Sequence, residues 1–77
     1  MKANIEGLGN CIRQVRRYKG VNQSALAGAC GISVSTLTHF ETGKTSVGSK
    51  TLEDIIKMMN CSITIIDNDS ENKFDVV

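Results

Sequence analysis

The stretch from Val21 to Lys44 constrains the fold most strongly, because it holds the signals of two short helices with almost no chain between them. Asn22 and Ser33 carry side-chain oxygens that accept unpaired amide protons in a first helical turn, so each predicts a helix start. Apolar residues flank each of these caps at the spacing of a hydrophobic staple, which fixes how the chain enters the helix. The staple pairs are Val21 with Leu26 and Ile32 with Leu37.

Apolar residues recur at helical spacing over residues 8–19, 23–30, 34–41 and 50–59, which predicts four helices. Gly20, Gly31 and Asn60 stand where a left-handed residue ends a helix. Only Gly31, Ile32 and Ser33 separate the second predicted helix from the third, and two helices joined so tightly form a helix-turn-helix. The predicted fold class is therefore all-α, a helix-turn-helix bundle, and the expected ligand is double-stranded DNA.

Residues 61–67 switch to a period of two with β-branched side chains, which predicts a strand. A lone strand leaves its edge unpaired, so we expect it to pair with its copy in a homodimer. The expected dimer strand consists of Ser62, Ile63, Thr64, Ile65 and Ile66. Residues 68–77 are polar and acidic and are predicted to form a flexible tail. The predicted domain thus spans residues 1–67.

The net charge of +1 hides an asymmetry along the chain. Residues 1–50 hold seven basic and two acidic residues, or +5, whereas residues 51–77 hold two basic and six acidic ones, or −4. This division suggests a body that faces phosphates and an acidic end kept away from DNA. The alternative is that both are ordinary solvated faces.

Other functional classes find little support in the sequence. The three cysteines have neither zinc-ligand spacing nor a disulfide pattern, which favours free thiols in a reducing cytoplasm and no bound metal. No apolar run is long enough for a membrane span, and no leader pattern is present. We expect no enzyme and no cofactor, because a nucleophile–base pair, a metal cluster and a glycine-rich phosphate loop are all missing.

The third predicted helix has one face opposite its apolar residues Leu37 and Phe40. At about 100° per residue, Ser35, Thr38 and His39 point away from the core. In a helix-turn-helix the start of this helix enters the major groove, where hydroxyl, methyl and imidazole groups can contact base edges. The predicted base-reading residues are Ser33, Val34, Ser35, Thr38 and His39. His39 has an alternative as a solvated residue without a role.

Further polar and basic residues are placed to hold the DNA backbone. Asn22 and Gln23 present amides at the positive end of the second helix, a natural site for a phosphate. Such contacts position the protein without specifying sequence. The predicted phosphate-binding set is Asn22, Gln23, Thr36, Thr42, Lys44 and Arg17. Arg16, in contrast, lies near the apolar stripe of the first helix and needs a partner, for which Glu41 is the best placed.

Residues 12–60 resemble the lambda-repressor-like, or XRE, family of helix-turn-helix regulators. The matching residues are Gln23, Leu26-Ala27, Gly31-Ile32-Ser33, Ser35–Leu37 and Phe40–Lys44. The resemblance implies a bundle of four to five helices, homodimeric operator binding, no catalysis, and an internal Arg16–Glu41 pair.

The ending from Thr51 to Ile65 resembles that of HipB-like antitoxins. This resemblance implies a strand that pairs across the dimer, repression of the protein's own operon, and a kinase toxin as partner. Three alternatives stay open: a phage-type repressor, the controller of a restriction–modification operon, and a partner-binding module with secondary DNA contact. Phe74, Val76 and Val77 motivate the last of these, because apolar residues on a flexible tail can anchor in a partner.

Overall fold

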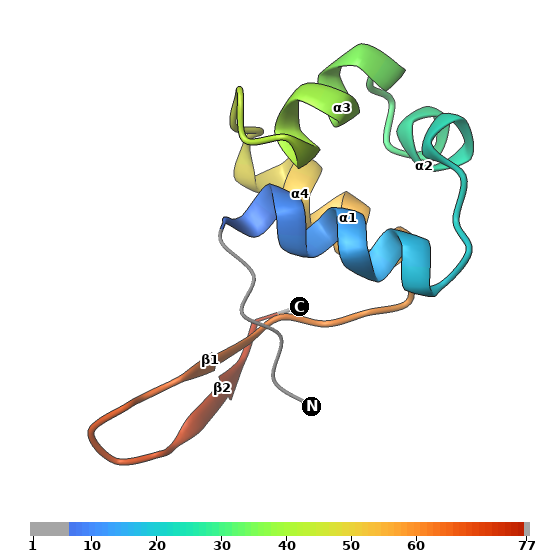
Figure 1. Cartoon of the computed structure of the whole chain (residues 1–77). Helices are drawn as coiled ribbons and strands as arrows, with labels where there is room; N and C mark the ends of the chain where they lie inside the picture. The colour runs from blue at the N-terminus through green and yellow to red at the C-terminus, as the bar shows by residue number, and fades with distance from the viewer. Residues whose placement is uncertain (1–6, 77) are drawn as a thin grey trace.

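The computed structural model describes residues 7–76, which form four helices followed by a two-stranded antiparallel hairpin (Figure 1). The helices are α1 (Leu8–Tyr18), α2 (Gln23–Ala29), α3 (Val34–Glu41) and α4 (Ser49–Met58), and the strands are β1 (Thr64–Ile66) and β2 (Lys73–Asp75). The predicted helical bundle with a C-terminal strand is confirmed, and every predicted helix end agrees within one residue. Residues 1–6 of the predicted domain and Val77 of the predicted tail lie outside the described residues.

The predicted caps shape the turns on either side of α2. Asn22 Oδ1 accepts hydrogen bonds from the backbone amides of Ser24 and Ala25, at 2.7 and 3.3 Å. Ser33 Oγ accepts from the amide of Thr36 at 3.0 Å and so caps α3. Gly31 has φ +69°, a left-handed conformation that costs little without a Cβ. These local features set α3 at a fixed angle to α2.

One hydrophobic core joins the four helices. Leu37 and Ile55 lie at its centre and are fully buried. The buried cluster consists of Ile12, Leu26, Ala27, Leu37, Phe40, Ile55, Ile56 and Met59. Val21 and Ile32, the outer members of the two staples, pack against this cluster as predicted. Both helices of the helix-turn-helix are therefore anchored in the same core.

Gly9 lies where the start of α1 packs against the end of α3. It is buried, and a Cβ at this position would overlap the carbonyl oxygen of Phe40. The sequence suggests only that glycine weakens a helix here. The structure shows the contact that requires it: the first turn of α1 passes directly against the backbone at the end of α3.

The C-terminal segment differs from its prediction in two ways. Only Thr64–Ile66 of the predicted strand over 61–67 is extended in a ladder, and its partner is β2 of the same chain, with Ile65 opposite Phe74. The prediction of a flexible tail over 68–77 is therefore wrong for Lys73–Asp75, which form a strand. One edge of β1 is therefore paired with β2 of the same chain, whereas the sequence suggests pairing with a second copy.

A compact turn at Asp67 explains the reversal. Asp67 Oδ1 accepts from the amide of Asp69 at 2.9 Å, and its Oδ2 accepts from the hydroxyl of Ser70 at 2.8 Å. Glu71 follows with φ +63° and brings the chain back. These two donors stabilise the ionised carboxylate and lower the pKa of Asp67 below its ordinary value of 3.8. The polar residues that suggest a tail instead build a turn.

Candidate nucleic-acid interface

The exposed face of α3 carries the central residues of the predicted base-reading set. Ser35 and His39 are exposed, and Val34 is 40% exposed at the start of the helix. Thr38 is only half-buried at the edge of this face. The sequence predicts that the buried side of α3 is centred between Leu37 and Phe40. Glu41 is buried as well, so the buried side extends further around the helix and reaches the edge at Thr38.

The hydroxyl groups around the start of α3 are partly used within the helix. Ser33 Oγ accepts from the Thr36 amide and lies 2.9 Å from Thr36 Oγ1, to which it donates. Thr42 Oγ1 donates to the carbonyl oxygens of Thr38 and His39, at 3.0 and 3.3 Å. The hydroxyl oxygens of Ser33, Thr36 and Thr42 can still accept a hydrogen bond. The only hydroxyl proton of Thr42, however, is already donated within the helix. A phosphate, which needs donors, would find little in the Thr42 side chain.

The remaining residues predicted to contact the DNA backbone come from α1, α2 and the turn after α3. Lys44 is exposed just after α3, where that helix meets the first turn of α1 at Gly9. Arg17 is exposed in the last turn of α1, about 12 Å further along that helix at its rise of 1.5 Å per residue. Asn22 and Gln23 open α2, the element that follows Arg17. Two cations are therefore exposed in this region, Lys44 just after α3 and Arg17 at the end of α1.

A buried network holds the three helices of this region together. Arg16 Nε and Nη2 donate to Glu41 Oε2 and Oε1 at 2.7 and 3.0 Å, so the predicted ion pair is present and bidentate. Arg16 Nη1 also donates to the carbonyl oxygen of Val21 at 3.0 Å. Gln23 Nε2 donates to Glu41 Oε1 at 3.0 Å. This last bond is not among the sequence predictions, which assign Gln23 to a phosphate; the signal for it is that a buried carboxylate such as Glu41 needs further hydrogen-bond donors.

The surface of α1, α2 and α3 presents no carboxylate. Glu41 is the only acidic residue from Gly7 to Leu52, and it is 1% exposed and paired with Arg16. Basic side chains are exposed at Arg17, Lys19, Lys44 and Lys50 over the same range. This part of the molecule therefore offers a polyanion cations and neutral hydrogen-bonding groups without opposing negative charge.

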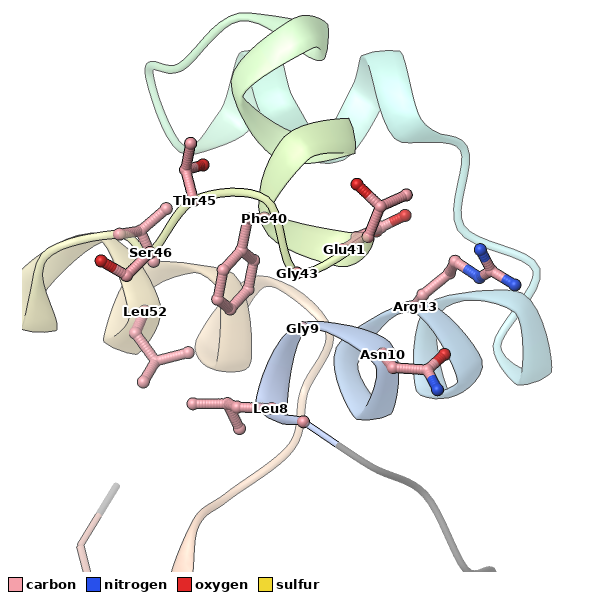
Figure 2. A pocket seen from close by; sticks show the side chains of 13 residues that line it. Leu8, Gly9, Asn10, Arg13, Phe40, Glu41, Gly43, Thr45, Ser46 and Leu52 are labelled. Carbon is pink, nitrogen blue, oxygen red and sulfur yellow. The ribbon is translucent and has the colours of Figure 1, made fainter.

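A hollow of about 630 Å³ lies between the start of α1, the end of α3 and the start of α4. Figure 2 shows Leu8, Phe40 and Leu52 converging on it, while Arg13 points away from this apolar group. Arg13 Nε is buried and has no hydrogen-bond partner among the described residues. Ser35 and His39 do not line the hollow. It is therefore separate from the exposed face of α3.

Residues 7–76 contain neither a membrane-spanning helix nor a cluster of metal ligands. No helix there has the length and apolar character to cross a membrane. No group of three or more histidine, cysteine or acidic residues is arranged there to hold a metal ion.

Comparison with known proteins identifies the architecture. No curated protein matches the chain. Among solved structures, the chain is similar to the solution structure of the DNA-binding domain of the P22 C2 repressor (residues 1–76), with a TM-score of 0.70 and 27% sequence identity. The match covers 78% of this chain and 79% of the repressor domain. The model of the helix-turn-helix family HTH_3 matches residues 12–66, which include all four helices almost completely. The chain therefore belongs to this XRE-type helix-turn-helix family.

Proposed function

We propose that this protein is a DNA-binding transcriptional repressor that acts as a homodimer on an inverted-repeat operator. The observation that carries the proposal is the neutral, exposed face of α3, with Lys44 exposed just after that helix, Arg17 exposed in the last turn of α1 and no exposed carboxylate from Gly7 to Leu52. The DNA-binding function of the similar P22 C2 repressor domain supports it.

The side chains of the α3 face determine how bases are read. Ser35 and His39 lie on its most exposed part, and Val34 lies at its leading end. A valine methyl suits the thymine methyl group, whereas hydroxyl and imidazole groups form single hydrogen bonds with base edges. None of these residues makes the two-point contact typical of Arg, Asn or Gln. Specificity per half-site is therefore modest and includes a contribution from DNA shape.

Binding to two half-sites at once compensates for the modest specificity of each single half-site. A two-fold symmetric dimer binds half-sites about one helical turn apart, so the operator repeats in inverted orientation. The hairpin of β1 and β2, which includes Thr64–Ile66 of the predicted dimer strand, projects from the helical bundle on the side away from α2 and α3 (Figure 1). A dimer contact there leaves the α3 faces uncovered.

Selection from a random duplex library at physiological salt tests the proposal. We expect enrichment of an inverted repeat with half-sites about one helical turn, or a multiple of it, apart. Uniform, salt-sensitive retention without enrichment would contradict a sequence-specific repressor.

A pair of charge variants locates the interface. Ser35→Glu places a carboxylate on the α3 face and should abolish binding to the selected operator. Asn68→Glu adds the same charge in the exposed turn of the hairpin and should leave binding unchanged. Equal losses in both variants would indicate a general charge effect and remove α3 from the interface.

A HipB-like antitoxin role is the finer form of this proposal. Its support is the strand that directly follows α4 and the exposed apolar residues of the hairpin, with Phe74 57% and Val76 52% exposed. Such residues suit contact with a protein partner, a kinase toxin in that subfamily. Phe74→Ser should release a copurifying kinase while operator binding persists. Retention of the kinase by the variant would remove Phe74 from the contact. A parent protein that copurifies with no kinase would favour the phage-type or restriction–modification regulators, which need no toxin contact.

A further inference from the structure

We infer that the hollow between the start of α1, the end of α3 and the start of α4 binds a small amphipathic monocarboxylate. Its carboxylate lies on Arg13, and its apolar body lies against Leu8, Phe40 and Leu52. Binding itself is independent of the proposed function, whereas its effect on an operator rests on that function.

The hollow has the size and the mixed lining of a small-molecule site. Its volume of about 630 Å³ falls within the roughly 300–1,000 Å³ of ligand pockets, which are mostly apolar with a few polar groups that orient the ligand. Figure 2 shows the apolar side chains on one side of Gly9 and those of Asn10 and Arg13 on the other. The lining therefore divides into an apolar end and a polar end.

The apolar end is incompletely covered. Leu8 is 50% exposed there, although it is a large aliphatic side chain. Val47 and Leu52 pack against the core but are only partly buried. An apolar body placed against these side chains removes surface from water, which is the general source of affinity in such sites.

The polar end holds a hydrogen-bond donor without a partner. Arg13 Nε is buried, and no described residue accepts a hydrogen bond from it. Buried donors in native proteins nearly always have a partner, so this one points to an acceptor from outside the described chain. A guanidinium offers two parallel N–H groups, and the two oxygens of a carboxylate accept from both at once.

The charges around the hollow favour an anion. Glu41 is the only carboxylate among the described lining residues, and its two oxygens already accept from Arg16 and Gln23. Arg13 therefore has no free counter-charge in that lining. One guanidinium beside apolar surface matches a singly charged ion with an apolar body, whereas inorganic phosphate would fill only the polar end.

Octanoate tests the site, with acetate and 1-octanol as controls for its charge and its apolar chain. Titration of the full chain, followed by NMR shifts of the backbone amides, reports both affinity and location. We expect shifts at Gly9, Gly43 and Leu52, and binding at least about tenfold tighter than that of either control. Equal binding of octanoate and 1-octanol, or shifts centred elsewhere in the chain, would overturn the inference.

Variants identify the two ends of the site. Arg13→Gln should weaken octanoate binding about tenfold or more and leave 1-octanol binding unchanged. Lys57→Gln is the matched control, because it removes the same charge from an exposed residue of α4 outside the hollow. It should change octanoate binding less than about twofold. Leu8→Ala should weaken both ligands about threefold or more.

Circular dichroism confirms that the variants are folded. A folded Arg13→Gln protein that binds octanoate as the parent does would overturn the inference. If that variant does not fold, the comparison of octanoate with 1-octanol in the parent decides. A parent that binds no octanoate would also overturn the inference and would leave the hollow to another occupant, a segment of the same chain or a second copy.

The site adjoins a residue of the proposed DNA interface. Lys44 lies between Gly43 and Thr45, which both line the hollow. A carboxylate bound nearby reduces the attraction of this region for a polyanion, so saturating octanoate should weaken operator binding about twofold to fivefold. Acetate at the same concentration controls for ionic strength.

Failure here is distinguishable from failure of the proposed function. Octanoate binding with unchanged operator affinity would contradict the coupling and leave the ligand site in place. A protein that binds octanoate through Arg13 but selects no operator would contradict the repressor alone. A protein that selects an inverted repeat but binds no octanoate would contradict the ligand site alone.

Discussion

Gln23 and Arg16 donate to the same oxygen of Glu41, each at 3.0 Å, so the first residue of α2 is tied to the buried ion pair between α1 and α3. The amide keeps a second N–H that the bond to Glu41 does not use. Gln23 therefore links the interior of the bundle to the surface where a DNA phosphate is expected.

Gln23→Ala should weaken binding to all operator sequences by a similar factor, because a phosphate contact carries no sequence information. It should also lower the free energy of unfolding by about 1–2 kcal/mol through the lost bond to Glu41. Titration of two duplexes that differ at one base pair, together with urea unfolding, measures both effects. A loss confined to one duplex would count against the phosphate role.

Glu41→Ala should lower the free energy of unfolding by about 3–5 kcal/mol, because the buried Arg16 guanidinium loses its counter-ion. Urea unfolding followed by circular dichroism measures the change. The matched control is Asp54→Ala, which breaks the exposed Lys50–Asp54 pair and should leave the midpoint nearly unchanged. If both variants unfold at the parent midpoint, the Arg16–Glu41 pair does not stabilise the fold.

Gly9→Ala should destabilise the protein by about 1–3 kcal/mol, because the new methyl group forces the first turn of α1 away from the Phe40 carbonyl. Gly28→Ala is the control, since it is exposed, helical and has nothing within 4 Å of the added Cβ. That substitution should stabilise by about 0.5–1 kcal/mol through helix propensity. Thermal unfolding of both variants compares them, and changes of the same sign would contradict the close helix contact.

Ser35→Ala and Thr38→Ala should change the preferred operator to different extents. Ser35 is exposed, so its loss should remove about 1–3 kcal/mol of discrimination at the contacted base pair. Thr38 is half-buried at the edge of the face and should have the smaller effect. Repeating the library selection with each variant reports the change. Unaltered selection by Ser35→Ala would show that α3 presents another face to DNA.

The hairpin turn should loosen at low pH. The pKa of Asp67 is lowered by the Asp69 amide and the Ser70 hydroxyl, so the ionised carboxylate is the form that stabilises the turn. That contribution is complete above the ordinary value of 3.8 and is lost as the pH falls through the lowered value. Exchange protection of the Asp69 amide should therefore fall below about pH 4. Asp67→Asn should remove this pH dependence, and its persistence in the variant would assign it to another group.

Local signals explain why the helices were predictable and the hairpin was not. Asn22, Ser33 and Gly31 each act within a few residues, through a cap or a left-handed turn, so the sequence shows them directly. Pairing of Ile65 with Phe74 instead depends on the reversal at Asp67, made of residue types that are equally common in irregular tails.

The candidate interface was likewise predictable only where local helical periodicity determines which side chains are exposed. Helical periodicity correctly predicts the exposure of Ser35 and His39. It places Thr38 on the same face, because the wheel takes the direction of the core from Leu37 and Phe40 alone, whereas Glu41 is buried as well. Burial of a carboxylate depends on Arg16, 25 residues away, and a single-helix pattern does not contain that information.

The three-way contact of Arg16 also affects how the molecule opens. One guanidinium joins α1 to the turn before α2 and to the end of α3, so neither helix of the helix-turn-helix detaches while this side chain stays in place. Backbone amides in α2 and α3 should then exchange with solvent at one common rate set by complete unfolding, even though both helices are only seven or eight residues long.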